Sequence, residues 1–166
     1  KISILNLIPR FIDETTKQSI ERGLELAKWA DGQNFERYWV AEHHNSKSIS
    51  CSATDLIIGY ILENTNRIKV GAGGVMLPNH TPFQVAERYG TLETLYPERI
   101  DLGIGRAPGT DIETAKLIYR DTYKEDNFKE AIRTLLSYFE KEAENFNVRP
   151  YPGVGTHVPV YILGSS

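Results

Sequence analysis

VGAGGVMLPNHTP, residues 70–82, is an apolar strand pattern that three glycines interrupt before it enters a polar turn. A glycine inside a strand indicates that another group approaches the backbone closely. The two neighbouring strands also end in polar or glycine-rich residues. Glu42-His43-His44 follow the preceding strand, and Gly103-Ile104-Gly105-Arg106 end the following strand. Functional residues at successive strand ends are typical of a (β/α) barrel, whose active site lies at the carboxyl ends of its strands.

Strand and helix patterns alternate along the rest of the chain. Strand patterns occupy residues 2–8, 37–41, 67–75, 100–105 and 158–163, and helical patterns occupy residues 15–33, 52–62, 81–95 and a stretch from Asn127. Thr81-Pro82-Phe83-Gln84 has the hydroxyl cap, early proline and glutamine of a helix start, and Ser52 with Asp55 has a similar pattern. Residues 107–125 form a polar excursion. This order predicts a parallel sheet with right-handed crossovers and sequential strands.

Five strands do not close a (β/α)8 barrel, which needs eight strands and about 250 residues. We therefore interpret residues 1–166 as a single domain, the N-terminal portion of a longer barrel that holds its first five β/α units. The competing architecture is a five-stranded, doubly wound sheet of flavodoxin type. That fold calls for a phosphate loop after the first strand, where Pro9-Arg10-Phe11 stands instead.

Composition narrows the function classes. The net charge of −3 and the scattered Lys and Arg residues argue against nucleic acid as a partner. No run approaches the eighteen or so apolar residues of a membrane span. The single Cys51 has no internal disulfide partner, and the first residues form a strand pattern rather than a cleavable signal. We expect a cytoplasmic protein that does not contact membranes.

Glu42-His43-His44 is the first candidate for chemistry. Histidine titrates near neutrality and suits general acid/base work. Adjacent strand residues point to opposite faces, so His43 and His44 face the same side only if the strand has already ended. The trio lacks a third ligand at metal-binding spacing, and we expect no metal site. The alternative is a purely structural role, in which the glutamate and an imidazole form hydrogen bonds that support a loop.

The other strand ends offer groups suited to a cofactor. Gly73-Gly74 would let a flat ring lie against the backbone, or would accommodate packing. Arg106 offers forked donors to a phosphate or carboxylate, unless it pairs with a neighbouring acid such as Asp101. Ser165 and Ser166 offer hydroxyl and backbone donors to a phosphate if a helix follows them, and otherwise form a helix cap.

Five motifs together resemble the luciferase-like flavin monooxygenases, the family of bacterial luciferase. The resemblance covers almost the whole chain in the correct order, and residues 105–111 look especially like the short bacterial members that are not luminescent. The family fold is a TIM barrel of about twice this length. The motifs are residues 41–44, 70–82, 86–95, 99–106 and 158–166.

The resemblance implies that reduced FMN and dioxygen oxygenate a small organic substrate, with the flavin supplied by a separate NAD(P)H:flavin reductase. It places His43 at the catalytic histidine, with His44 as a second catalytic candidate. Gly73-Gly74 matches a non-prolyl cis peptide beneath the flavin ring, and Arg106 with Ser166 matches the flavin-phosphate contacts. Glu42 and Ser165 are further cofactor-binding candidates, although luciferase has an acidic residue at the position of Ser165 and a cysteine at that of Gly105. A homodimer is expected for the full-length protein.

Two other functions remain open at this point. Some relatives use the deazaflavin F420 for hydride transfer, and they share the barrel and the cis peptide. Others bind flavin without catalysing a reaction. In that case His43 would have no catalytic role, whereas Arg106 would still contribute to flavin binding.

Overall fold

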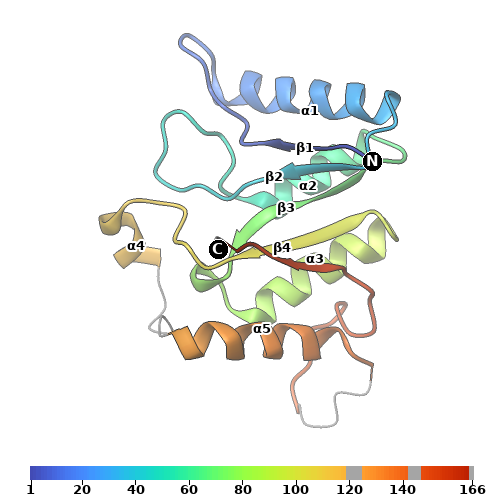
Figure 1. The fold of residues 1–166 in the computed structure, drawn as a ribbon, viewed down its shortest axis with the longest axis vertical. Helices are drawn as coiled ribbons and strands as arrows, with labels where there is room; N and C mark the ends of the chain where they lie inside the picture. Colours follow the sequence, from blue (N-terminus) through green and yellow to red (C-terminus); the bar gives the residue numbers. More distant parts are fainter. Residues whose placement is uncertain (119–124, 142–146, 165–166) are drawn as a thin grey trace.

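The computed structural model describes residues 1–118, 125–141 and 147–164. In these ranges five strands alternate with helices, one after each of the first three strands and two after the fourth, and a short 3-10 turn, η1, follows the third strand (Figure 1). The strands are β1 (Ser3–Asn6), β2 (Arg37–Val40), β3 (Lys69–Met76), β4 (Ile100–Gly105) and β5 (Val160–Ile162). The helices are α1 (Thr16–Gly32), α2 (Thr54–Glu63), α3 (Pro82–Leu95), α4 (Ile112–Ile118) and α5 (Glu125–Phe139), and η1 spans Leu77–Asn79.

The sheet is parallel throughout, with strands in the sequential order β1-β2-β3-β4-β5. This confirms the predicted topology and excludes the doubly wound alternative, in which β1 would lie between later strands. The register is regular except between Ala72 and Val75, where the pairing of β3 with β4 shifts at the two adjacent glycines. The shift re-aims the end of β3, as bulges beside functional sites do.

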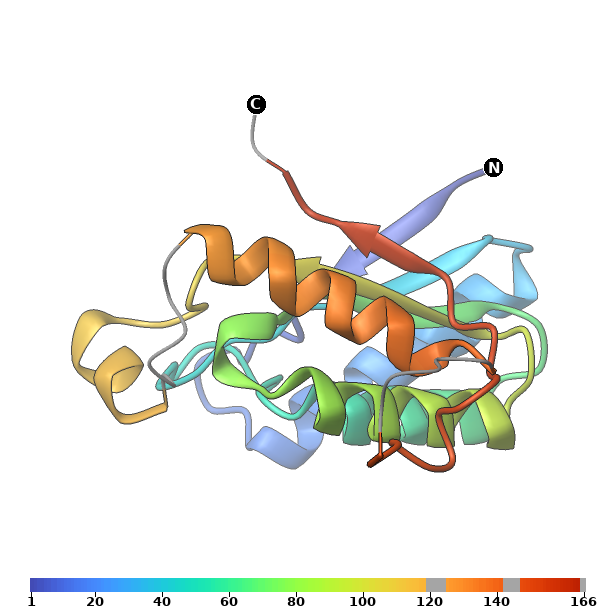
Figure 2. The same cartoon turned by 90° about the horizontal axis from the view of Figure 1, so that it is seen from below.

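The hydrophobic core lies between the sheet and the helices on one of its faces (Figure 2). Val70, Leu102 and Ile104 from the central strands pack there with Ile58 of α2 and Tyr89 of α3, all fully buried. The opposite face carries Trp39 and Tyr161, whose rings meet edge to face at 5.3 Å. Leu5 and Leu163, on the edge strand β1 and directly after β5, are exposed. A parallel sheet with one bare face is the arrangement of an incomplete barrel, whose interior this face would line.

Local signals explain most element boundaries. Thr81 caps α3 by accepting from the main-chain N–H of Gln84 at 3.2 Å, as predicted. The predicted cap at Ser52 is wrong, because α2 begins at Thr54 behind Ala53, which makes no side-chain cap. Helix α4 falls in the expected polar excursion, and of its described residues only Ala115 is buried. No helix in the described ranges is long and apolar enough to cross a membrane.

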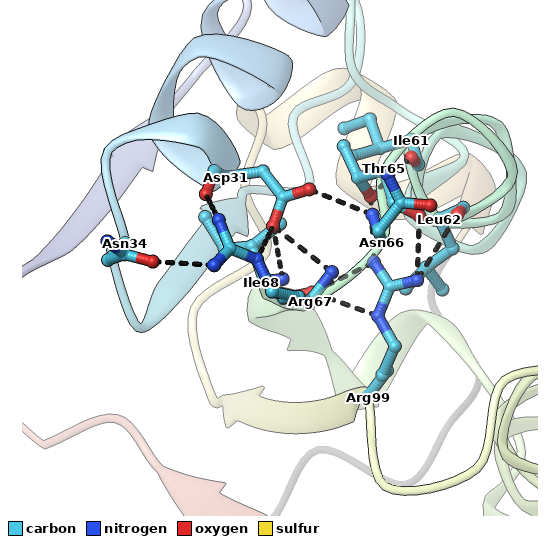
Figure 3. Close-up of polar contacts among 9 residues, drawn as sticks. All are labelled: Asp31, Asn34, Ile61, Leu62, Thr65, Asn66, Arg67, Ile68 and Arg99. Carbon is cyan, nitrogen blue, oxygen red and sulfur yellow. Dashed lines mark hydrogen bonds and ion pairs between the residues drawn. The ribbon is translucent and has the colours of Figure 1, made fainter.

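A polar cluster fastens the helices to the amino ends of the strands (Figure 3). The carboxylate of Asp31 accepts from the main-chain N–H groups of Asn66 at 2.8 Å, Arg67 at 3.1 Å and Ile68 at 2.8 Å. Arg99 donates to the carbonyl oxygens of Thr65 at 2.8 Å and Ile68 at 3.0 Å. The cluster therefore joins the end of α1 to the starts of β3 and β4, at the barrel end associated with stability rather than chemistry.

Asp31→Asn is expected to lower the free energy of unfolding by about 1 to 3 kcal/mol, because an amide presents its own N–H groups to donors that need an acceptor. Burial raises the pKa of the Asp31 carboxyl, but the three main-chain N–H groups outweigh burial and hold that pKa below its ordinary value. A lowered folded pKa adds stability that is present above about pH 4 and is lost as the pH falls through the folded value.

Urea unfolding of wild type and Asp31→Asn at pH 7 and pH 3 measures both effects, and their stabilities should converge at the lower pH. Asp13→Asn is the matched control, because Asp13 is exposed and its left-handed backbone, with φ of 66°, suits asparagine equally well. An equal loss in both variants would show that the main-chain acceptor role of Asp31 is unimportant.

Candidate functional site

The carboxyl ends of β2, β3 and β4 bring most of the predicted site residues to one edge of the sheet. Glu42 and His43 follow β2, Gly73 and Gly74 lie near the end of β3, and Arg106 directly follows β4. The main-chain N–H of Glu42 donates to the carbonyl of Gly74 at 3.3 Å, so the first two groups are in direct contact. Ser165 and Ser166 lie outside the described residues.

Glu42 is the centre of the polar network at this edge. Its side chain is 1% exposed, and its oxygens face Nε2 of His44 at 2.6 Å, Nε2 of His80 at 2.9 Å and Nδ2 of Asn79 at 2.9 Å. The main-chain N–H of Met76 donates to it at 2.9 Å. A carboxylate only accepts, so Nε2 of both rings carries the proton in this arrangement.

The network holds Glu42 ionised. Burial raises the pKa of the Glu42 carboxyl, but hydrogen bonds from His80, His44 and Asn79 outweigh burial and leave that pKa below its ordinary value. Donors to a buried carboxylate act in this direction because they favour its charged form. Both oxygens are occupied by protein groups, so the described contacts give Glu42 the role of tying the ends of β2 and β3 together.

The loop after β4 joins the same network. The main-chain N–H of His44 donates to the carbonyl of Gly109 at 2.9 Å, and Nδ2 of Asn79 donates to the carbonyl of Pro108 at 3.1 Å. Gly109 has a φ of +64°, and a Cβ there would lie 2.7 Å from the carbonyl oxygen of Glu42. This position therefore requires glycine both for its backbone conformation and for the close approach.

Sequence reasoning missed Asn79 and His80 as members of the site. Both stand between Pro78 and the helix cap at Thr81, directly after a strand end. That position was the available signal, since polar residues at this point of a parallel sheet lie at the same edge as Glu42.

The adjacent imidazoles of His43 and His44 line different cavities. His44 and His80 line one of about 450 Å³ near the starts of α2 and α3. His43 lines one of about 300 Å³ beside the loops that follow β1 and β2. His43 is half-buried, its main-chain N–H donates to Cys51, and its Nδ1 is buried without a hydrogen-bond partner in the described residues. His43 Nδ1 is therefore a buried polar atom whose hydrogen bond the described residues do not supply.

The glycines of β3 differ in the space around them. A Cβ at Gly71 would lie 2.3 Å from the carbonyl oxygen of Asp101, and one at Gly74 would lie 2.8 Å from that of Gly103. At Gly73 the nearest atoms are side-chain carbons, Cβ of Trp39 at 3.3 Å and Cδ1 of Leu5 at 3.5 Å. The Gly73-Gly74 peptide is cis, as expected from the resemblance. Strand pairing therefore accounts for Gly71 and Gly74, but it does not account for Gly73.

The residues present fit a flavin at this edge. Gly73 is half-buried and offers bare backbone, His43 offers an unpaired ring nitrogen, and Arg106 is exposed directly after β4. In the described part of the chain, no group of three or more His, Cys, Asp or Glu residues is arranged to hold a metal ion.

Comparison with known proteins agrees with this geometry. The family model for luciferase-like monooxygenases matches residues 1–166. The chain is 49% identical over 166 residues to the protein YddN of Bacillus subtilis, covering 99% of this chain and 49% of YddN. It is 45% identical over 165 residues to the luciferase-like monooxygenase of Escherichia coli strain K12, covering 99% of this chain and 49% of the relative. The chain thus spans about half the length of these curated relatives.

Solved structures show the same fold. Apo-MsnO8 superposes with a TM-score of 0.92 at 33% identity, over all of this chain and 50% of that one. The oxygenating constituent of 3,6-diketocamphane monooxygenase in complex with FMN, and an F420-dependent secondary alcohol dehydrogenase, superpose with TM-scores of 0.75 and 0.76 at 18% identity. They cover 95% and 98% of this chain and about half of their own chains, and they show the fold alone. The five-stranded sheet is thus part of a TIM barrel, and the chain belongs to the luciferase-like monooxygenase family.

Proposed function

We propose that the full-length protein uses reduced FMN and dioxygen to oxygenate a small organic substrate. The observation that carries this proposal is the gathering of His43, Gly73 and Arg106 at one edge of the sheet, in a chain of this family. Bound reduced FMN would supply the electrons that activate dioxygen. A separate NAD(P)H:flavin reductase would supply the reduced flavin.

Each residue has a distinct part in the proposed reaction. Gly73 and Gly74 offer bare backbone to the flavin ring, and Arg106, with Ser165 and Ser166, would hold its phosphate. His43 would hold or transfer a proton beside the reacting atoms, as its unpaired Nδ1 permits. Glu42 and His44 would act by fixing the loops around His43, since their side chains bind each other.

The absorption spectrum of the purified full-length protein, mixed with FMN and separately with F420, tests the choice of cofactor. We expect FMN to bind and F420 not to bind. Product formation with reduced FMN, oxygen and a panel of organic acceptors then tests turnover. Binding of F420 alone would favour hydride transfer, and FMN binding without any product would favour a non-catalytic flavoprotein.

Arg106→Ala is expected to weaken FMN binding by about 1.5 to 3 kcal/mol, because a guanidinium on a phosphate makes charge-assisted hydrogen bonds. Fluorescence titration of the full-length protein with FMN measures the loss. Riboflavin lacks the phosphate and is the control ligand, whose binding should not change. An equal loss for both ligands would show that Arg106 supports the fold.

We also propose that the full-length protein is a homodimer. Helix α2 is apolar on its outer side as well as its inner one, with Leu56 73% exposed and Tyr60 43% exposed. Apolar side chains gathered on an outer helix face mark a contact surface. Sedimentation of the full-length protein tests this, and a monomer would contradict it.

A further inference from the structure

A polar cavity of about 300 Å³ lies between the loops that follow β1 and β2. The loops are fixed to each other, because the main-chain N–H of Arg10 donates to Ser48 at 2.8 Å and that of Ser50 donates to Ile8 at 3.0 Å. The residues that line it include Arg10, Thr16, His43, Lys47 and Ser52. The cavity is thus formed by hydrogen-bonded backbone and has the size of a small-ligand site.

The residues that line this cavity include positively charged side chains but no negatively charged ones. Arg10 and Lys47 contribute cations, and none of the lining residues is Asp or Glu. Within the described residues, neither cationic group forms a side-chain hydrogen bond or ion pair. By contrast, Arg22 pairs with Glu14 at 2.9 Å, also next to the first loop. Two cations without a protein counter-charge leave the cavity suited to an anion.

Asp111, in the loop after β4, contacts a residue that lines this cavity. Asp111 accepts from Nδ2 of Asn45 at 2.9 Å, and also from the main-chain N–H of Thr114 at 2.9 Å and its hydroxyl at 2.8 Å. Asn45 lines the cavity. Asp111 keeps its negative charge, because all of these donors are neutral, but no ion pair within the described residues joins it to Arg10 or Lys47.

His43 links this cavity to the candidate active site. His43 is among the residues that line the cavity, and the main-chain N–H of Glu42 before it donates to the carbonyl of Gly74 on the next strand. A molecule whose charged end lay near Arg10 and Lys47 would therefore share a cavity with His43. Guanidinium, ammonium and hydroxyl donors together are the groups that bind carboxylates and sulfonates.

We infer that this cavity binds the anionic group of the substrate, a carboxylate or sulfonate on a small organic molecule. The inference rests on the proposed function, because only an oxygenase would have this anion as its substrate. It assigns that substrate to the organic carboxylates and sulfonates. Oxygenation would take place on the uncharged part of the molecule, beyond His43.

The experiment measures binding to flavin-free full-length protein by calorimetry at constant ionic strength. The ligands are hexanoate, its uncharged counterpart hexanamide, hexanesulfonate and inorganic phosphate. We expect both organic anions to bind at least tenfold more tightly than hexanamide and more tightly than phosphate. The double variant Arg10→Gln/Lys47→Gln should lose this preference.

Lys28→Gln is the matched control, because it removes an exposed positive charge from α1 outside the cavity. It should keep the preference, and circular dichroism confirms that each variant is folded. Equal binding of hexanoate and hexanamide to wild type, or a preference retained by the double variant, would overturn the inference. Tighter binding of phosphate would also overturn it, since the site would then serve a phosphate. Because no flavin is present, failure of FMN-dependent oxygenation would leave this result unaffected.

Discussion

Replacing His43 with alanine should lower the rate of substrate oxygenation about 100-fold or more while FMN binding stays close to that of wild type. His43 lies after β2 and directly follows Glu42, whose main-chain N–H donates to the carbonyl of Gly74 at 3.3 Å. Its Nδ1 has no protein partner among the described residues, so the fold does not depend on a hydrogen bond from that atom. The expected loss therefore falls on proton transfer rather than on stability.

Product formation and release of hydrogen peroxide, followed together with reduced FMN and oxygen, measure this effect. His43→Ala should still consume oxygen, because the reduced flavin remains bound, but the oxygen should be released as hydrogen peroxide and not transferred to the substrate. His44→Ala is the informative comparison, since its Nε2 lies 2.6 Å from Glu42 and its loss should lower thermal stability more than His43→Ala does. An unchanged product yield in His43→Ala would remove this residue from the mechanism.

The order of elements could be predicted because local patterns specify it. β4 spans the predicted residues 100–105, and Thr81 caps α3, since both depend on a few consecutive residues. Helix α4 was missed because Ile112 and Leu117 are exposed and leave no buried stripe to detect. At Ser52 the sequence pattern misled, because α2 begins two residues later, at Thr54, and Ala53 occupies the cap position.

The candidate site was only partly predictable for a different reason. Strand ends identified His43, Gly73 and Arg106, since parallel strands place their carboxyl ends at one edge. The pairing of Glu42 with His80 joins residues 38 positions apart and depends on how the loops fold over that edge. No spacing rule connects such positions, and the sequence alone therefore contained no sign of the protein donors that surround Glu42, whose contact with flavin stays a prediction.

The second large expected effect is a loss of stability on substitution of a glycine in β3 by alanine. Gly71 and Gly73 differ in the atoms that the added methyl group would contact. Gly71→Ala should lower the free energy of unfolding by about 3 kcal/mol or more, the upper end for overpacking. Its Cβ would lie 2.3 Å from the carbonyl oxygen of Asp101 and 2.9 Å from Cζ3 of Trp39. The first of these is backbone of the paired strand β4, which cannot move without breaking the sheet.

Gly73→Ala should cost about 1 kcal/mol or less, since its nearest neighbours are side-chain carbons at 3.3 Å and 3.5 Å. It should nevertheless weaken FMN binding at least tenfold, because the added methyl group would occupy the bare backbone that we propose lies against the flavin ring. Urea unfolding and FMN titration of both full-length variants measure the two quantities separately. If Gly73→Ala bound FMN as wild type does, Gly73 would serve strand packing alone, and the flavin ring would have to lie elsewhere at the carboxyl ends of the strands.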